Sequence, residues 1–311
     1  MFKKLMLAGV AAGVGVALTV APAAAKDLNS IGVTVGSLGN PFFIAVGKGA
    51  TDAAKAINPN VQITMASADY DLGKQSTQID NFIASRVDMI LVNASDPRAI
   101  GPAVKRAQAA GITVVAVDVA AEGANATVQT DNVQAGRIAC QYMVEQIGGK
   151  GNVIIQNGPQ VSSVIDRVNG CKQVLSQNSD VKLLSSDQDA KGSRDGGLNV
   201  MQGHLTRFPD IKGVFTINDP QAIGSDLAAK QLNRTGLVIT SVDGAPDIVG
   251  ALKGNTQVKA SASQDPYTMG KMAVQIGYDI MNDKKPENPV VLMPSKLVTR
   301  DNVGEYQGWT R

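Results

Sequence analysis

Hydrophobic positions along the chain follow two alternating patterns from Ile31 onward. Short runs are continuously apolar and rich in β-branched residues, which is typical of strands buried inside a parallel sheet. Between these runs, apolar residues recur every three or four positions, which predicts amphipathic helices. The predicted strands span residues 31–35, 61–65, 89–92, 112–117, 127–129, 153–155, 181–184, 214–217, 237–242 and 258–263. The predicted helices span residues 41–57, 72–85, 97–110, 132–147, 162–175, 194–208, 220–231, 248–253 and 267–281.

Strands that alternate with helices predict the α/β class, with parallel sheets covered by helices on both faces. A first set of strands ends with residues 112–117 and a second set begins with residues 127–129, so we predict two doubly wound lobes. The length of 311 residues agrees with two domains of about 150 residues each. A single barrel of eight strand–helix units, which needs about 250 residues, is the alternative fold.

The N-terminus has the pattern of a secretory signal peptide. Lys3 and Lys4 precede an apolar run over residues 5–20, and small residues follow at 21–25. We expect cleavage after Ala25 and export of the mature chain to the periplasm. The alternative is a retained membrane anchor. No later stretch of the sequence has the 18 consecutive apolar residues that would indicate a transmembrane helix.

Composition excludes several classes of function. The 29 Lys and Arg residues nearly balance the 27 Asp and Glu residues, and removal of Lys3 and Lys4 makes the mature chain neutral. A neutral chain gives no electrostatic basis for binding nucleic acid. One histidine and two cysteines are too few for a zinc site of the His/Cys type, and we expect neither a metal nor a cofactor. His204 would have to serve any Ser-His-Asp centre, but its polar surroundings predict an exposed position on a helix.

Cys140 and Cys171 lie on the apolar faces of consecutive predicted helices. Met143 shares the face of Cys140 at helical spacing, and Val168 shares the face of Cys171. Export to an oxidising compartment favours a disulfide between the two cysteines, and this is the pairing that we predict. The alternative is two buried free thiols that pack as small hydrophobic side chains.

Polar residues follow most of the predicted strands. In doubly wound sheets the ligand binds beyond the carboxyl ends of the strands, so these residues are candidates for a binding site. Most are amides or single acids, which exchange hydrogen bonds with hydroxyl groups, and two adjacent phenylalanines follow the first strand. The candidates are Asn40, Phe42, Phe43, Asp118, Arg167, Asn218, Asp243 and Gln264.

Known catalytic motifs fit this sequence poorly. The spacing of Gly32, Gly36 and Gly39 differs from that of a dinucleotide-binding motif, and the sequence contains no phosphate-binding P-loop motif. Asp118 and Asp243 leave open a pair of catalytic carboxylates like that of a glycosidase. One isolated acid in each lobe suits hydrogen bonding to hydroxyl groups better, so we expect a binding protein and not an enzyme.

Eight short segments, in this order along the chain, are similar to those of a known family. They are Asn40-Pro41-Phe42-Phe43, Val117-Asp118, Thr130-Asp131-Asn132, Asp166-Arg167, Gly197-Leu198-Asn199-Val200-Met201-Gln202, Asn218-Asp219, Val242-Asp243-Gly244 and Gln264. With them, residues 28–300 resemble the periplasmic sugar-binding proteins of ABC importers, in the ribose-binding branch of the type I fold. The lactose-repressor family shares this fold, but here a signal peptide occupies the place of a DNA-binding helix-turn-helix.

The resemblance implies that three chain crossings, near Thr130, Gln264 and Val291, form a hinge between the lobes. The N-terminal lobe would comprise residues 26–130 and 265–291, and the C-terminal lobe residues 131–264 and 292–311. The N-terminal lobe would contribute a stacking aromatic face and polar contacts to a sugar, from Phe42 or Phe43 and from Asn40 and Asp118. The C-terminal lobe would complete the polar ring with Arg167, Asn218 and Asp243, and Gln264 would lie at a hinge strand.

Two positions depart from the pattern of the ribose binders. Val119 follows Asp118 where those proteins have an arginine, and Gly192 occupies a position where the family usually has an aromatic residue. Lys191 or Ser193 would then supply compensating polar contacts. The departures predict a ligand other than ribose, such as a different pentose, a ketose or a linear polyol.

The function that this resemblance implies is that of a monomeric periplasmic binding protein. It would capture a neutral sugar or polyol by hinge closure and deliver it to an inner-membrane ABC permease, without catalysing a reaction. A sensor that presents a sugar to a chemoreceptor or sensor kinase is the alternative function. An exported sugar-modifying enzyme is a third possibility.

Overall fold

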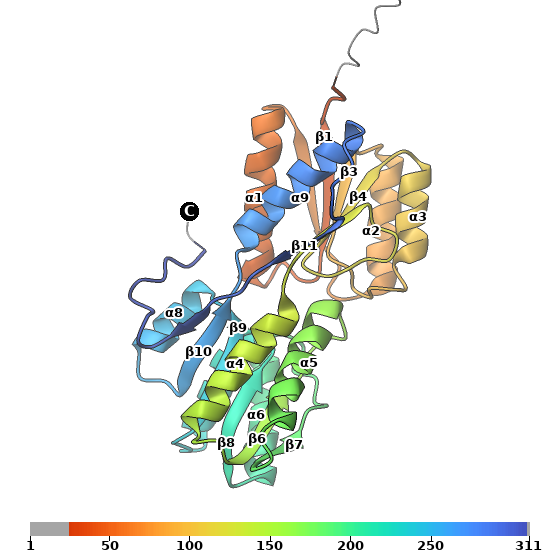
Figure 1. The fold of residues 1–311 in the computed structure, drawn as a ribbon. Coiled ribbons are helices and arrows are strands. Elements are labelled where there is room, and N and C mark those ends of the chain that lie inside the picture. The colour runs from red at the N-terminus through yellow and green to blue at the C-terminus, as the bar shows by residue number, and fades with distance from the viewer. Residues whose placement is uncertain (1–24, 310–311) are drawn as a thin grey trace, which may run out of the picture.

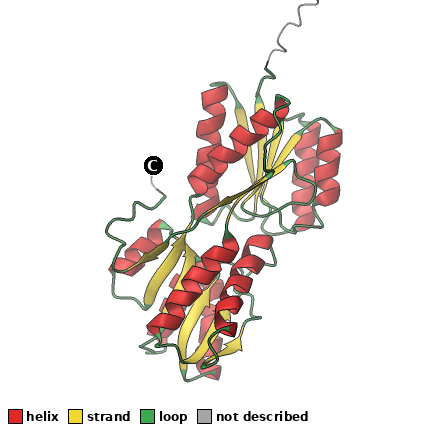
Figure 2. Cartoon of the chain, in the orientation of Figure 1, coloured by secondary structure: helices red, strands yellow, loops and turns green. Residues whose placement is uncertain are grey.

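Two six-stranded sheets organise residues 25–309, the part of the chain that the structure, a computed structural model, describes (Figure 1). Each sheet carries helices on both faces, so the two sheets form two α/β lobes (Figure 2). The predicted α/β class with two doubly wound lobes is confirmed, and the single barrel is excluded because both sheets are open. The predicted signal peptide, residues 1–25, lies outside the described residues except for Ala25.

The first sheet has the strand order β11-β5-β4-β3-β1-β2, and its neighbouring strands are parallel. Its strands are β1 (Ser30–Val35), β2 (Gln62–Ser67), β3 (Met89–Val92), β4 (Thr113–Val117), β5 (Ala126–Thr130) and β11 (Val290–Met293). One face carries α1 (Pro41–Ile57) and α9 (Pro266–Met281), and the other carries α2 (Leu72–Ala84) and α3 (Gly101–Ala109) (Figure 1). Strands β3 and β4 are buried along their whole length, which explains their continuously apolar sequences.

The second sheet has the strand order β12-β10-β9-β8-β6-β7. Its strands are β6 (Gly151–Gln156), β7 (Val181–Ser185), β8 (Ile211–Thr216), β9 (Val238–Asp243), β10 (Val258–Ser263) and β12 (Leu297–Thr299). Its helices are α4 (Asn132–Gln146), α5 (Ser162–Ser176), α6 (Arg194–Arg207), α7 (Asp219–Gln231) and α8 (Pro246–Lys253). Only β12 at one edge runs antiparallel to its neighbour among these strands of the described chain.

The chain crosses three times between the two sheets. It leaves the first sheet after Thr130, returns after Gln264 to form α9, and passes from β11 to β12 after Met293. The third crossing therefore follows Met293, two residues beyond the position predicted from the sequence, Val291. Val291 pairs with Val128 inside the first sheet, and the pairing of β11 with β5 continues to the end of both strands.

Three predictions need correction. Residues 127–129, predicted to begin the second set of strands, belong to β5, which pairs with β4 and β11 in the first sheet. The helix predicted to start at residue 97 starts at Gly101, because the Asp96 carboxylate accepts the backbone N–H groups of Arg98 and Ala99 and holds them in a preceding turn. His204, predicted to be exposed, is buried with 5% of its surface accessible and stacks against Phe208 at a ring-centroid distance of 6.1 Å. Its neighbours in sequence are polar, but α6 turns this position inward.

The packing of α4 on α5 holds the start of α5 in place. A Cβ atom at Gly136 on α4 would lie 2.0 Å from the carbonyl oxygen of Arg167 on α5, so only glycine permits this approach of the two backbones. Cys140 and Cys171 form a disulfide between the same two helices, which confirms the predicted pairing over the free-thiol alternative. The position of Arg167 is therefore determined by a close helix contact and a nearby cross-link.

Candidate functional site

Eight of the nine predicted ligand-binding residues line one pocket between the lobes. They are Asn40, Phe42, Phe43, Asp118, Arg167, Asn218, Asp243 and Gln264. Each ends or follows a strand or lies early in the next helix, so the carboxyl ends of both sheets face this pocket. The lobes touch beside it, where the backbone N–H of Ala120 donates to Ser162 Oγ across 2.9 Å. The structure thus brings together residues that are far apart in the sequence.

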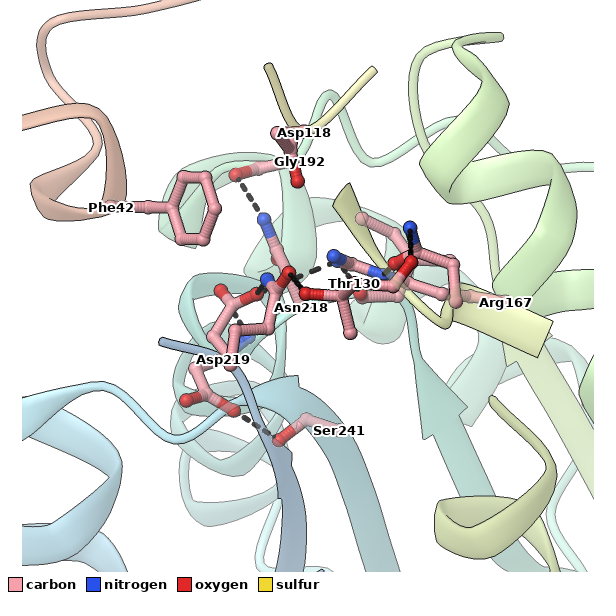
Figure 3. Close-up of polar contacts among 12 residues, drawn as sticks. Phe42, Asp118, Thr130, Arg167, Gly192, Asn218, Asp219 and Ser241 are labelled. Carbon is pink, nitrogen blue, oxygen red and sulfur yellow. Dashed lines mark hydrogen bonds and ion pairs between the residues drawn. The ribbon is translucent and has the colours of Figure 1, made fainter. Parts of the chain in front are cut away.

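Asp118 on the first lobe presents an unpaired acceptor atom to the pocket (Figure 3). Its Oδ2 accepts a hydrogen bond from Asn93 Nδ2 at 3.0 Å, and Asn93 Oδ1 accepts one from the backbone N–H of Gly36 at 3.1 Å. Its Oδ1 is buried and has no hydrogen-bond partner among residues 25–309. Burial raises the pKa of Asp118 to about 6, although Arg167 and Asn93 favour the charged form.

Arg167 supplies the positive charge on the second lobe (Figure 3). Its Nε donates to Asn132 Oδ1 at 2.8 Å, and its Nη1 donates to the backbone oxygen of Ile217 at 2.8 Å. Nη1 also lies 3.5 Å from Asp243 Oδ1, which forms a buried ion pair. Within the described chain, Nη2 of Arg167 donates no hydrogen bond, so its two N–H groups are available to a ligand.

Asp243 connects Arg167 to the hinge. Gln264 Nε2 donates to Asp243 Oδ1 at 2.8 Å, and Gln264 Oε1 accepts from the Thr130 hydroxyl at 2.7 Å. Burial raises the pKa of Asp243 to about 6, with Arg167 as the strongest opposing influence. Because two of the three crossings begin directly after Thr130 and Gln264, this chain of hydrogen bonds couples the hinge to the pocket.

Asn218 caps α7 and holds the loop before α6. Its Oδ1 accepts the backbone N–H of Gln221 at 3.1 Å, and its Nδ2 donates to the carbonyl oxygen of Gly192 at 2.9 Å (Figure 3). Gly192 has a φ of +61°, which favours glycine. A larger residue there would be strained. Because Gly192 has no side chain, the backbone of this loop lines the pocket at this position.

Asp219 does not line this pocket and was not selected from the sequence. Its carboxylate accepts hydrogen bonds from the hydroxyls of Ser241 at 2.5 Å and Ser261 at 2.6 Å, and from the backbone N–H of Ala245 at 2.7 Å. Burial, reinforced by the nearby Asp243, raises the pKa of Asp219. These contacts join the ends of β9 and β10, so Asp219 supports the strand that carries Asp243.

Three aromatic residues of the first lobe line the pocket. Phe42 and Phe43 are both buried and meet edge to face, with ring centroids 5.4 Å apart. Tyr70, which we did not select from the sequence, lies beyond the end of β2, and its ring covers Gly36 so closely that a Cβ there would lie 2.5 Å away. Tyr70 follows a strand, so the rule that selected the other candidates could have selected it as well.

Lys191 lies outside this pocket, in an exposed loop. It lines a second, outer pocket with residues of both lobes, and its backbone N–H donates to Asp189 Oδ1 at 2.7 Å. Ser193 uses its hydroxyl to cap α6 by accepting the backbone N–H of Gly196 at 3.1 Å. Neither Lys191 nor Ser193 lines the inner pocket.

Two further features of the described chain bear on its chemistry. None of the helices in residues 25–309 is both long enough and apolar enough to cross a membrane. The same residues contain no group of three or more His, Cys, Asp or Glu side chains placed to hold a metal ion.

Two α/β lobes with a polar, buried pocket at the hinge are typical of periplasmic binding proteins. The family described as the periplasmic binding protein domain matches residues 31–285, and the chain belongs to this family. Its relatives described below bind solutes.

Two relatives are similar over most of their length. A xylitol-binding protein of Mycolicibacterium smegmatis is 33% identical over 308 residues, which cover 96% of this chain and 86% of that protein. The ribose import binding protein RbsB of Bacillus subtilis is 32% identical over 276 residues, which cover 87% of each chain.

Solved structures of solute-binding proteins share the fold. One from Mycobacterium smegmatis with bound glycerol has a TM-score of 0.83 and 28% identity, and the match covers 91% of this chain and 98% of the other. One from Bacillus halodurans C-125 with bound myo-inositol has a TM-score of 0.82 and 25% identity, with 90% and 97% covered. Both belong to ABC transporters.

Proposed function

We propose that this protein is the periplasmic binding component of an ABC importer and that it closes its lobes on a neutral sugar or polyol. The observation that carries this proposal is the pair of unused polar groups on opposite lobes. Asp118 Oδ1 is a buried acceptor without a partner, and Arg167 Nη2 is a donor without one among the described residues. A hydroxyl group both donates and accepts, so a ligand with several hydroxyls satisfies both walls at once.

Neutral ligands fit the charges of the pocket better than ionic ones. The Arg167 guanidinium already faces the Asp243 carboxylate, so a second carboxylate or phosphate would meet buried Asp118 and Asp243. A cation would meet Arg167. Hydroxyl groups leave the net charge of the closed pocket unchanged and receive charge-assisted hydrogen bonds.

We propose a linear polyol of about five carbons, with xylitol as the first candidate. The second lobe offers no aromatic face at Gly192 to sandwich a flat ring, and Val119 adds an apolar wall beside Asp118. An extended polyol needs no flat stacking surface, and its C–H groups can contact Phe42, Phe43 and Tyr70. The similarity to a xylitol-binding protein supports this choice.

The proposed function includes export and excludes catalysis. Cleavage of the predicted signal peptide after Ala25 would release the mature protein into the periplasm, where an inner-membrane permease would receive the ligand. Delivery requires that the bound sugar or polyol leaves unchanged. We therefore expect mass spectrometry of xylitol after prolonged incubation with the protein to show no conversion.

Isothermal titration calorimetry against a panel of xylitol, ribitol, sorbitol, myo-inositol, D-allose and D-ribose tests the proposal. We expect xylitol to bind more tightly than D-ribose, and Asp118→Ala to weaken the binding by roughly tenfold or more, because its removal costs at least 1.4 kcal/mol of paired hydrogen bonding. Tighter binding of D-ribose than of every polyol would refute the ligand assignment. Unchanged binding by Asp118→Ala would refute the site.

A further inference from the structure

The C-terminal segment, residues 300–309, connects the two halves of the pocket. After β12 the chain passes along the second lobe, where Val303 is buried in the core and Tyr306 packs against it. It then continues to Trp309, which packs with the core of the first lobe. In Figure 1 this dark blue segment passes the outer side of α8 in the second lobe and then rises on the left toward the level of the first lobe.

Two aromatic residues of this segment hold the backbone at Asp243. Trp309 Nε1 donates to the carbonyl oxygen of Asp243 at 3.1 Å, and the Tyr306 hydroxyl donates to that of Gly244 at 2.9 Å. Asp243 has a φ of +136°, which non-glycine residues rarely adopt. Such a conformation persists only where the surroundings hold it, and the two hydrogen bonds are part of those surroundings.

The same indole ring contacts the ligand-facing side of the first lobe. Its centroid lies 5.7 Å from that of Phe42, with an angle of 75° between the rings, which is a favourable edge-to-face arrangement. Phe42 also lines the pocket. Trp309 therefore contacts Phe42 of one lobe and Asp243 of the other, and both of these residues line the proposed binding site.

We propose that Trp309 is a positioning residue of the binding site, a role that rests on the proposed function above. It fixes the backbone that carries the Asp243 carboxylate and supports the ring of Phe42. The hydrogen bond to Asp243 lies within the second lobe, whereas the contact with Phe42 joins the lobes. Opening of the hinge separates Trp309 from Phe42, and closure restores the contact.

Trp309 is the single tryptophan of the sequence, so its fluorescence reports on this contact directly. We expect addition of xylitol to the wild-type mature protein to shift the emission to shorter wavelength, and to decrease quenching by acrylamide, because closure covers the indole with Phe42. Phe42→Ala should lose most of this shift. An emission spectrum that xylitol leaves unchanged, while calorimetry shows binding, would overturn the proposed contact between lobes.

Affinity measurements separate positioning from general stability. We expect Trp309→Ala to raise the Kd for xylitol about tenfold, and Trp309→Phe, which keeps a ring but loses the indole N–H, to raise it less. Val303→Ala is the matched control, since Val303 lies on the same segment but only in the core of the second lobe. It should lower the melting temperature and leave the Kd unchanged.

The outcomes distinguish this role from the proposed function. Wild-type affinity for xylitol in Trp309→Ala would overturn the positioning role alone. An equal loss of affinity in Val303→Ala and Trp309→Ala would also overturn it, because the effect would then be one of stability. A wild-type protein that binds no carbohydrate of the panel would overturn the proposed function and this role with it.

Discussion

Replacement of Asp118 by asparagine should stabilise the ligand-free protein and weaken the binding of ligand. The carboxylate is 6% exposed, and one of its oxygens is buried without a partner among the described residues. Asparagine keeps an oxygen that can accept from Asn93 but carries no charge. It also tolerates the φ of +65° at this position better than most residues do.

The pKa of Asp118 gives the size of the effect. Burial raises it from 3.8 to about 6, so above pH 6 the charged carboxylate destabilises the folded state by about 3 kcal/mol relative to the protonated acid. For a chain of this length, removal of that penalty should raise the melting temperature at pH 8 by about 5 °C. The loss of a charged acceptor should weaken xylitol binding by about tenfold at the same pH.

The pH dependence of the wild-type protein follows from the same pKa. Between about pH 4 and pH 6 the folded state keeps a proton that the unfolded state releases, so this contribution to stability is present at low pH and disappears as the pH rises through 6. Xylitol hydroxyls donate to the charged carboxylate, so ligand affinity changes in the opposite direction. We expect the affinity to fall about tenfold between pH 8 and pH 5, as protonation removes the acceptor.

Scanning fluorimetry from pH 5 to pH 8, with and without xylitol, measures both trends. Asp118→Asn should raise the ligand-free melting temperature most at pH 8 and should reduce the pH dependence of binding, with Asp243 responsible for the remainder. Asp96→Asn is a control in the same lobe. Asp96 lies outside the pocket, and the backbone N–H groups of Ala99 and Arg98 lower the pKa of its carboxyl group, whereas burial raises that of Asp118. A lower melting temperature for Asp118→Asn than for wild type at pH 8 would refute this reasoning.

Two further predictions concern the packing of α4 on α5. The disulfide joins residues separated by 31 positions, so Cys140→Ala/Cys171→Ala should lower the free energy of unfolding in urea by about 3 to 4 kcal/mol. Two titratable thiols in denatured, unreduced wild-type protein would contradict the pairing. Gly136→Ala should lower both the melting temperature and the affinity for xylitol, because its methyl group would displace the backbone of Arg167. Gly203 has open space around it, so Gly203→Ala should raise the free energy of unfolding by up to about 1 kcal/mol. Equal melting temperatures for the two alanine variants would contradict the close approach of these helices.

The fold could be predicted where burial determines the sequence pattern. Strands β3 and β4 are covered on both faces, so they read as continuous apolar runs. Strands β11 and β12 escaped prediction because they are short edge strands, and β11 exposes Val290 and Leu292 to solvent. The third crossing was placed two residues too early for the same reason, since nothing in that segment marks the end of a buried strand.

The candidate site was predictable as far as strand ends determine it. The rule that ligands bind beyond the carboxyl ends of parallel strands selects Asp118 and Asp243 from the sequence alone. It gives no information about Trp309, which contacts the pocket residues Phe42 and Asp243 from a C-terminal segment without regular structure. Lys191 came instead from the departures at Val119 and Gly192, and sequence alone does not tell whether such a loop residue faces the inner pocket or the outer one.

The most direct test of the account is a crystal structure of the mature protein with xylitol. We expect the ligand in the pocket between the lobes, with one hydroxyl about 2.5 to 2.8 Å from Asp118 Oδ1 and another within hydrogen-bond distance of Arg167 Nη2. Xylitol bound in the outer pocket beside Lys191, or bound in contact with one lobe only, would contradict the central claim that the two lobes close on the ligand through these groups.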